Sequence, residues 1–138
     1  DAQLTLSQRA DLAGAVIVST PQDLALIDAR KGLNMFRRVN VPVLGIIENM
    51  SYFACPSCGD IFDIFGTGGA KAEAERLGLP FLGGIPLDIE IRATSDAGTP
   101  IVAENFSSPH AQAYLKIAEM LTVQLEQANR KGPAIIMD

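Results

Sequence analysis

Cysteine is scarce in this sequence: only Cys55 and Cys58 occur among 138 residues. Two cysteines cannot build the disulfide framework of a small secreted domain. The sequence also has neither a signal peptide nor an apolar stretch long enough to span a bilayer. We therefore expect a reducing, cytoplasmic compartment.

Concentrated positive charge is also absent. The formal net charge is −5, and basic residues form no run longer than a pair such as Arg37-Arg38. Nucleic acid and anionic membrane are therefore unfavourable partners on electrostatic grounds. The length and the 48% hydrophobic content fit one globular domain with its own core.

A phosphate-binding loop of the form G-x-x-x-x-G-K-[S/T] is missing from the whole sequence. The nearest candidate, Gly66-Thr67-Gly68-Gly69, follows the cysteines instead of a buried strand. It ends in Ala70-Lys71, without a hydroxyl group for magnesium. We interpret these glycines as the entry to a helix.

Apolar β-branched runs alternate with amphipathic segments along the chain. Strands are predicted at residues 14–19, 42–48 and 80–85. Helices are predicted from a Thr20 N-cap to about Val39, from about Ala70 to Leu77, from an Asp88 N-cap toward Ala97, and from Ser108-Pro109 onward. The connections are too long for hairpins, which predicts an α/β fold with a partial parallel sheet flanked by helices. So small a sheet should leave an edge that invites another strand.

Two of the predicted helices carry apolar residues that we expect to be buried. In the first these are Leu24, Ile27, Met35, Phe36 and Val39, and in the last they are Tyr114, Ile117, Ala118, Leu121 and Leu125. The helices should therefore cover the sheet.

Polar side chains follow each predicted strand: Thr20, Asn49 and Asp88. Ligands of open parallel sheets bind at the carboxyl ends of the strands. The Asn49 amide can read the edge of a planar base, and Asp88 can accept from an amine or a ribose hydroxyl. On the residues alone, helix caps at Thr20 and Asp88 and a strand end at Asn49 explain them at least as well.

The pattern Cys55-Pro56-Ser57-Cys58-Gly59 carries the sharpest chemical signal. A thioredoxin-like redox pair should open a helix directly after a strand, whereas these cysteines lie inside a long loop. A zinc site within one chain would need two more ligands, and the sole histidine, His110, is more simply an exposed residue at a helix start. Two copies related by a two-fold axis could instead supply two thiolates each to one shared metal or cluster.

Three longer motifs in the sequence resemble one family. They are V-P-V-L-G-I-I-E-N-M-S-Y-F-x-C-P-x-C-G, then I-F-G-x-G-G-A, then L-G-x-I-P-L-D-x-x-I-R-x-x-S-D-x-G-x-P. Together they resemble the carboxyl-terminal half of the Mrp (ApbC) family of iron–sulfur cluster carrier ATPases. This family belongs to the deviant-Walker P-loop group that includes MinD and ParA-like proteins.

The resemblance implies a homodimer that binds a labile 4Fe–4S cluster and passes it to apo-proteins in an ATP-dependent cycle. Cys55 and Cys58 would be the bridging cluster ligands. Asn49 would contact adenine, and Pro86 with Asp88 would form the loop that closes over the base. Arg92 and Asp96 match the motif but are interpreted as structural.

The resemblance also implies that residues 1–130 are the carboxyl-terminal part of a P-loop NTPase domain. The CPxC loop, at about 50–65, would be an insertion, and residues 131–138 would be a loose tail. The family's P-loop would precede Asp1, so this chain alone is expected to lack catalytic residues and ATP hydrolysis. The alternative is a zinc-bridged dimerisation module without carrier or ATPase role.

Overall fold

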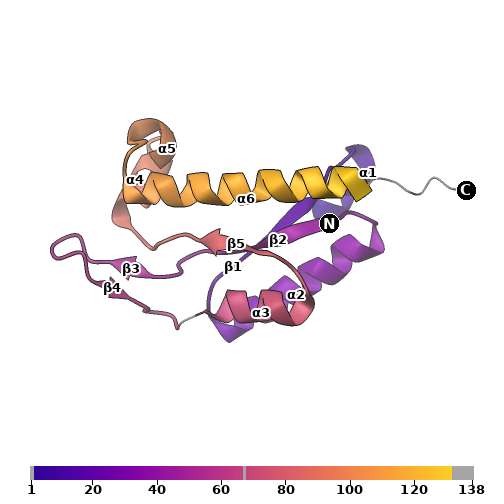
Figure 1. The fold of residues 1–138 in the computed structure, drawn as a ribbon, viewed down its shortest axis with the longest axis horizontal. Helices are drawn as coiled ribbons and strands as arrows, with labels where there is room; N and C mark the ends of the chain where they lie inside the picture. Colours follow the sequence, from indigo (N-terminus) through magenta and orange to yellow (C-terminus); the bar gives the residue numbers. More distant parts are fainter. Residues whose placement is uncertain (1, 67, 132–138) are drawn as a thin grey trace, which may run out of the picture.

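The apolar runs form a parallel sheet of three strands. The computed structural model describes residues 2–66 and 68–131 (Figure 1). Strands β1 (Ala15–Ser19), β2 (Val43–Glu48) and β5 (Phe81–Gly84) lie in the order β1-β2-β5. Ser19 pairs with Glu48, and Glu48 pairs with Gly84, so the three carboxyl ends are level. The predicted α/β fold with a partial parallel sheet is confirmed.

Helices cover both faces of this sheet (Figure 1). The helices are α1 (Ala2–Arg9), α2 (Asp23–Arg38), α3 (Gly69–Leu77), α4 (Ile89–Asp96), α5 (Ile101–Glu104) and α6 (Pro109–Lys131). On one face, α2 and α3 enclose a core that contains Ile17, Leu26, Ala29, Ile46, Ala70 and Ala74. On the other face, Ile117 of α6 packs with Leu82 and Ile85, and Tyr114 and Leu121 lie against them.

A small hairpin extends beyond the carboxyl ends of the strands (Figure 1). Its strands β3 (Phe53–Ala54) and β4 (Ile61–Phe62) are antiparallel and form a sheet of their own. The hairpin carries the C-P-S-C segment at its tip, between the two strands. The sequence predicted a loop here and not strands.

Two predictions about α2 are wrong. The N-cap position is Gln22, which makes no side-chain capping bond, so Thr20 does not cap the helix. A methyl group added at Gly69 would meet the Pro21 carbonyl oxygen at 2.8 Å, so this segment passes tightly against the start of α3. Ile27 is exposed, because the buried stripe is Leu26, Ala29 and Leu33 and Ile27 lies about 100° around the helix from Leu26.

Other packing predictions have mixed outcomes. The side chain of Leu24 lies outside the described residues. Ala118 is exposed, whereas Tyr114 and Leu121 pack as predicted. Val18 is exposed although it belongs to an apolar β-branched run. The reason is that α6 packs on β2 and β5, which leaves β1 at the uncovered edge of the sheet.

The carboxyl-terminal boundary differs slightly from the predicted one. Helix α6 ends at Lys131, so this residue is helical and not part of a tail. Residues 132–138, the rest of the predicted tail, lie outside the described residues. Within residues 2–66 and 68–131, none of the helices combines the length and the apolar composition of a membrane-spanning segment.

A buried carboxylate joins α2 to α3. Glu73 accepts hydrogen bonds from Arg30 at 2.5 and 2.9 Å and from Arg76 at 2.8 and 2.9 Å. These bonds, with that from Arg30 contributing most, lower the pKa of Glu73 from 4.5 to about 2. The ionised form is therefore favoured in the folded state, and its stabilisation is present above the unfolded pKa.

Acidification should therefore weaken the α2–α3 contact. We expect the stability that Glu73 contributes to be lost as the pH falls from 4.5 toward about 2. Glu73→Gln should cost about 1–2 kcal/mol of unfolding free energy at neutral pH and should flatten this acid dependence. Urea unfolding at a series of pH values measures both effects. Glu75→Gln, on an exposed carboxylate of the same helix, is the matched control. An unchanged acid dependence in Glu73→Gln would contradict the assignment.

Candidate functional site

The segment that leaves β2 is fixed by the buried side chain of Glu48. This carboxylate is 2% exposed. Its Oε1 accepts a hydrogen bond from Ser51 Oγ at 2.5 Å, and its Oε2 accepts one from the N–H of Ala70 at 2.9 Å. Glu48 therefore holds both the loop toward the cysteines and the amino end of α3.

This contact also explains the glycines before α3. Gly68 is the N-cap in a left-handed conformation, and the helix starts at Gly69. The amino end of a helix can bind an anion through its free N–H groups. At α3 the Glu48 carboxylate is that anion, because it accepts from the N–H of Ala70 in the first turn. Helix entry, as interpreted from the sequence, is the role that the described residues show, while Thr67 lies outside them.

Backbone hydrogen bonds join the loop after β2 to the loop after β5. The N–H of Ile85 donates to the Glu48 carbonyl at 2.8 Å, and that of Ser51 donates to the Ile85 carbonyl at 2.9 Å. Further along, the N–H of Leu87 donates to the Tyr52 carbonyl at 2.7 Å. The segments leading to the cysteines and to Asp88 therefore run side by side.

The cysteines lie in a tight turn at the end of the β3–β4 hairpin. The N–H of Cys55 donates to the Asp60 carbonyl, and the N–H of Gly59 donates to the Cys55 carbonyl, both at 2.8 Å. Gly59 has a φ of 79°, a left-handed conformation that favours glycine. Cys55 is half-buried and Cys58 is exposed, and both are free thiols.

Backbone N–H groups change the pKa of the Cys55 thiol. The N–H groups of Cys58 and then Ser57 lower the pKa of the Cys55 thiol below its usual value. The thiolate is the form that binds metals. The turn therefore presents two sulfur ligands at an accessible tip, which is half of the set that a tetrahedral metal or a cubane cluster requires.

Asn49, one of the predicted base contacts, lies beside the end of the edge strand β1. Its N–H donates to the Ser19 carbonyl at 2.6 Å, and its side-chain Oδ1 accepts from the N–H of Met50 at 3.0 Å. Asn49 lines a hollow of about 750 Å³ together with Thr20 and residues of β1 and α2. The amide nitrogen of its side chain donates to no residue within the described part of the chain, so it can donate to a ligand.

Pro86 and Asp88 follow β5. Pro86 is buried, and Asp88 Oδ1 accepts from the N–H of Glu90 at 2.7 Å, which confirms Asp88 as the N-cap of α4. Asp88 lines a second hollow, of about 720 Å³, whose wall includes Cys55 and Pro56. Asn49 and Asp88 thus open into two different hollows, and their common contact with one base stays a prediction.

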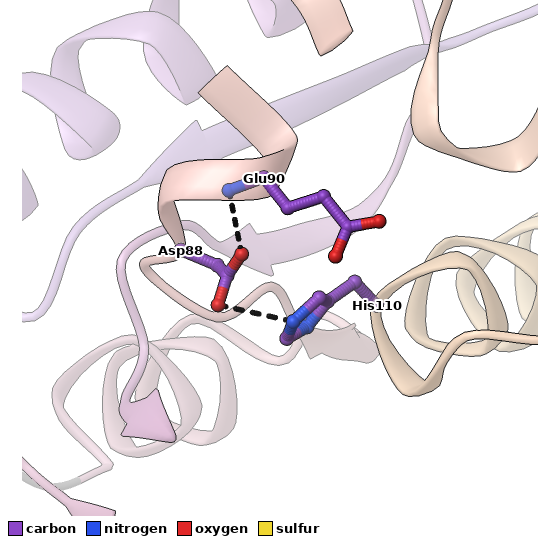
Figure 2. Close-up of side chains that lie close together, drawn as sticks. All are labelled: Asp88, Glu90 and His110. Carbon is purple, nitrogen blue, oxygen red and sulfur yellow. Dashed lines mark hydrogen bonds and ion pairs between the residues drawn. The ribbon is translucent and has the colours of Figure 1, made fainter. Parts of the chain in front are cut away.

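The interpretation of His110 as an exposed residue is wrong. Its Nε2 lies 3.0 Å from Asp88 Oδ2, and its side chain is only 15% exposed. It lines the same hollow as Cys55, at the start of α6 (Figure 2). Glu90, which the sequence did not single out, lies beside it. A contact between side chains at two helix starts far apart in sequence leaves no local signal in the sequence.

In its strand order and flanking helices the chain resembles a class of proteins, the MinD-like P-loop ATPases. The cell division ATPase MinD of Pyrococcus furiosus matches with a TM-score of 0.62 and 26% identity, over 80% of this chain and 43% of that chain. A nucleotide-binding protein of Archaeoglobus fulgidus, solved in complex with ADP and with Co found, matches with a TM-score of 0.66 and 41% identity. That match covers 80% of this chain and 44% of the other.

Sequence relatives narrow this class. The chain is 52% identical, over 99% of its length, to the iron–sulfur cluster transfer protein NUBPL of Dictyostelium discoideum. It is 50% identical, over 91% of its length, to an iron–sulfur cluster carrier protein of Aquifex aeolicus. The family model described as the ParA-type NUBPL iron-transfer P-loop NTPase matches residues 1–122. The chain belongs to this NUBPL/Mrp/ApbC family of ParA-like iron–sulfur cluster carriers, which confirms the resemblance.

The match extends over only part of each relative. The chain covers 44% of the Dictyostelium protein and 35% of the Aquifex protein. It therefore spans less than half of the length of the curated relatives that it matches.

Proposed function

We propose that this chain is the cluster-binding part of an iron–sulfur cluster carrier. Cys55 and Cys58 of two copies bind one 4Fe–4S cluster as cargo, which is then passed to apo-proteins. The observation that carries this proposal is the pair of free thiols at the tip of a projecting hairpin. The family and the names of its members, which are iron–sulfur cluster transfer and carrier proteins, support it.

The donor chemistry of the hairpin tip fits a cluster. Iron–sulfur clusters are held by cysteine thiolates, four in the case of 4Fe–4S. One chain supplies two of them, and the exposure of Cys58 allows a second chain to approach. Partial exposure of the sulfurs also suits a cargo that has to leave, since solvent access and hydrogen bonding tune cluster stability.

The hairpin also has an apolar surface that suits a contact between copies. Ile61 is 64% exposed and Phe62 is 49% exposed, and Ile64 and Phe65 follow them. Contiguous exposed apolar side chains typically mark interaction sites. A two-fold axis through the hairpin tips would bring these residues and the four thiolates together in one interface.

ATP enters this proposal only through the longer parent protein. In that protein Asn49 contacts the base and the loop of Pro86 and Asp88 closes over it, while a phosphate loop outside this chain binds the phosphates and magnesium. The free side-chain N–H₂ of Asn49 at the end of β2 supports a base contact. Binding and hydrolysis of ATP would then accompany loading or release of the cluster.

Anaerobic reconstitution of the 138-residue chain with iron and sulfide tests the proposal. We expect a brown species with about two iron and two sulfide ions per chain, corresponding to one 4Fe–4S cluster per pair of chains. Native mass spectrometry should show a dimer that carries the cluster. The chain without cluster is the control and should be mainly monomeric.

Two outcomes would contradict the proposal. Stoichiometric zinc without acid-labile sulfide, in protein purified without oxygen, would favour the zinc-bridged dimerisation module. A monomer that retains a complete cluster would exclude the shared site.

A further inference from the structure

We propose a second metal site, formed by Asp88, Glu90 and His110, which takes a divalent transition-metal ion. The three side chains come from the starts of two helices, and one possible ligand atom of each lies within 4.8 Å of the others (Figure 2). This site uses none of the cysteines and does not depend on the cluster proposal.

The spacing of the first pair fits coordination of one ion. His110 Nε2 and Asp88 Oδ2 are 3.0 Å apart. Bonds of about 2.0–2.2 Å from a metal to nitrogen and oxygen place neighbouring ligand atoms roughly 3.0–3.5 Å apart. Asp88 keeps its other oxygen on the N–H of Glu90, so its carboxylate is held in orientation and binds through Oδ2 alone.

The contact between Asp88 and His110 does not explain why a second carboxylate, that of Glu90, lies beside them. Its carboxylate has no hydrogen bond or salt bridge to any described residue, yet it lies next to Asp88 and His110. Two carboxylates at this distance repel each other, and a shared cation would remove that repulsion. Glu90 is exposed, so a rotation of its side chain can bring an oxygen to the ion.

The charges around Asp88, Glu90 and His110 favour the binding of a cation moderately. The amino ends of α4 and α6 each carry a partial positive charge of about half a unit. The negative charge of the two carboxylates outweighs this partial charge. We therefore expect a site of moderate affinity, and its mixed oxygen and imidazole donors favour a transition-metal ion over Mg²⁺.

The site has a route from solvent. Asp88, Glu90 and His110 line the hollow of about 720 Å³ that also contains Cys55, Pro56 and Ile61. An ion bound here would lie in the same hollow as the first thiol of the hairpin, which gives the chain a nitrogen–oxygen site and a sulfur site side by side.

Titration of the full chain with Co²⁺ tests this site independently of the cysteines. The Cys55→Ser, Cys58→Ser double variant should bind about one Co²⁺ per chain, with d–d absorption and no thiolate-to-cobalt charge-transfer band. In that background, Glu90→Gln and His110→Gln should each weaken Co²⁺ binding by roughly tenfold or more. Zn²⁺ should displace the Co²⁺, and Mg²⁺ should not.

The controls separate a metal ligand from a structural residue. Glu90→Gln keeps the backbone N–H that Asp88 caps, so it should leave the folded state intact even if His110→Gln destabilises the junction of α4 and α6. Glu104→Gln, on an exposed carboxylate of α5, should not change Co²⁺ affinity. Absence of Co²⁺ binding in the double variant, or unchanged affinity in Glu90→Gln, would overturn the proposal.

Discussion

Replacement of both Cys55 and Cys58 by serine should reduce the iron and acid-labile sulfide retained after reconstitution to background. The visible absorption should disappear, and the chain should stay monomeric. The physical reason is that a serine hydroxyl is a poor ligand for the iron of such a cluster, which is held by thiolates. Iron and sulfide assays with the visible spectrum measure the loss.

The fold should survive this change. Cys55 is half-buried and Cys58 is exposed, and the turn is held by backbone bonds from Cys55 and Gly59 that serine does not disturb. Ser57→Ala, between the two cysteines, is the matched control and should retain the cluster. If the double variant kept the spectrum of the unchanged chain, the ligands would have to be elsewhere.

Replacement of Glu48 by alanine should produce the largest loss of stability. It leaves the N–H of Ala70 and the hydroxyl of Ser51 without their acceptor. An unpaired buried polar group costs about 1–3 kcal/mol, so we expect a loss of roughly 2–4 kcal/mol in the unfolding free energy. This is a large share of the 5–15 kcal/mol that is typical of a domain. Urea unfolding followed by circular dichroism measures it.

Two milder variants rank the separate contributions of Glu48. Ser51→Ala removes only the hydroxyl donor and should cost about 1 kcal/mol. Glu48→Gln keeps one acceptor oxygen but turns an N–H₂ group toward the other donor, so its cost should fall between those of the other two. Equal stability of Glu48→Ala and the unchanged chain would show that the carboxylate does not hold the loop.

The sequence predicted those parts of the fold that depend on local patterns. Strands β1, β2 and β5 are apolar runs, Asp88 caps α4 as predicted, and α3 ends at Leu77 as predicted, with Gly78 as its C-cap. Both caps act within a few residues, so their signals lie in neighbouring positions. The cysteine motif was equally local, and the hairpin around it adds only the geometry that presents it.

The errors at Thr20 and His110 concern contacts between segments far apart in sequence. Thr20 has the residue type of an N-cap, but the N-cap position is Gln22, two residues later, and Pro21 between them lies against Gly69. His110 pairs with Asp88, and Glu48 reaches Ala70, across turns of the chain that no local pattern encodes. Propensity therefore placed the elements, while the polar contacts that build the site required the three-dimensional arrangement.

The loop between β2 and the hairpin contains Met50, a non-glycine residue in a left-handed conformation. Met50 has a φ of 51°, between Asn49, tied to the end of β1, and Ser51, tied to Glu48 and Ile85. A left-handed conformation costs a non-glycine residue about 1–2 kcal/mol. We expect this stored free energy to be released if a ligand at the end of β1 breaks the bond between Asn49 and Ser19. The bonds of Ser51 to Glu48 and Ile85 would stay intact, so the movement would be confined to Asn49 and Met50 and would leave the hairpin in place.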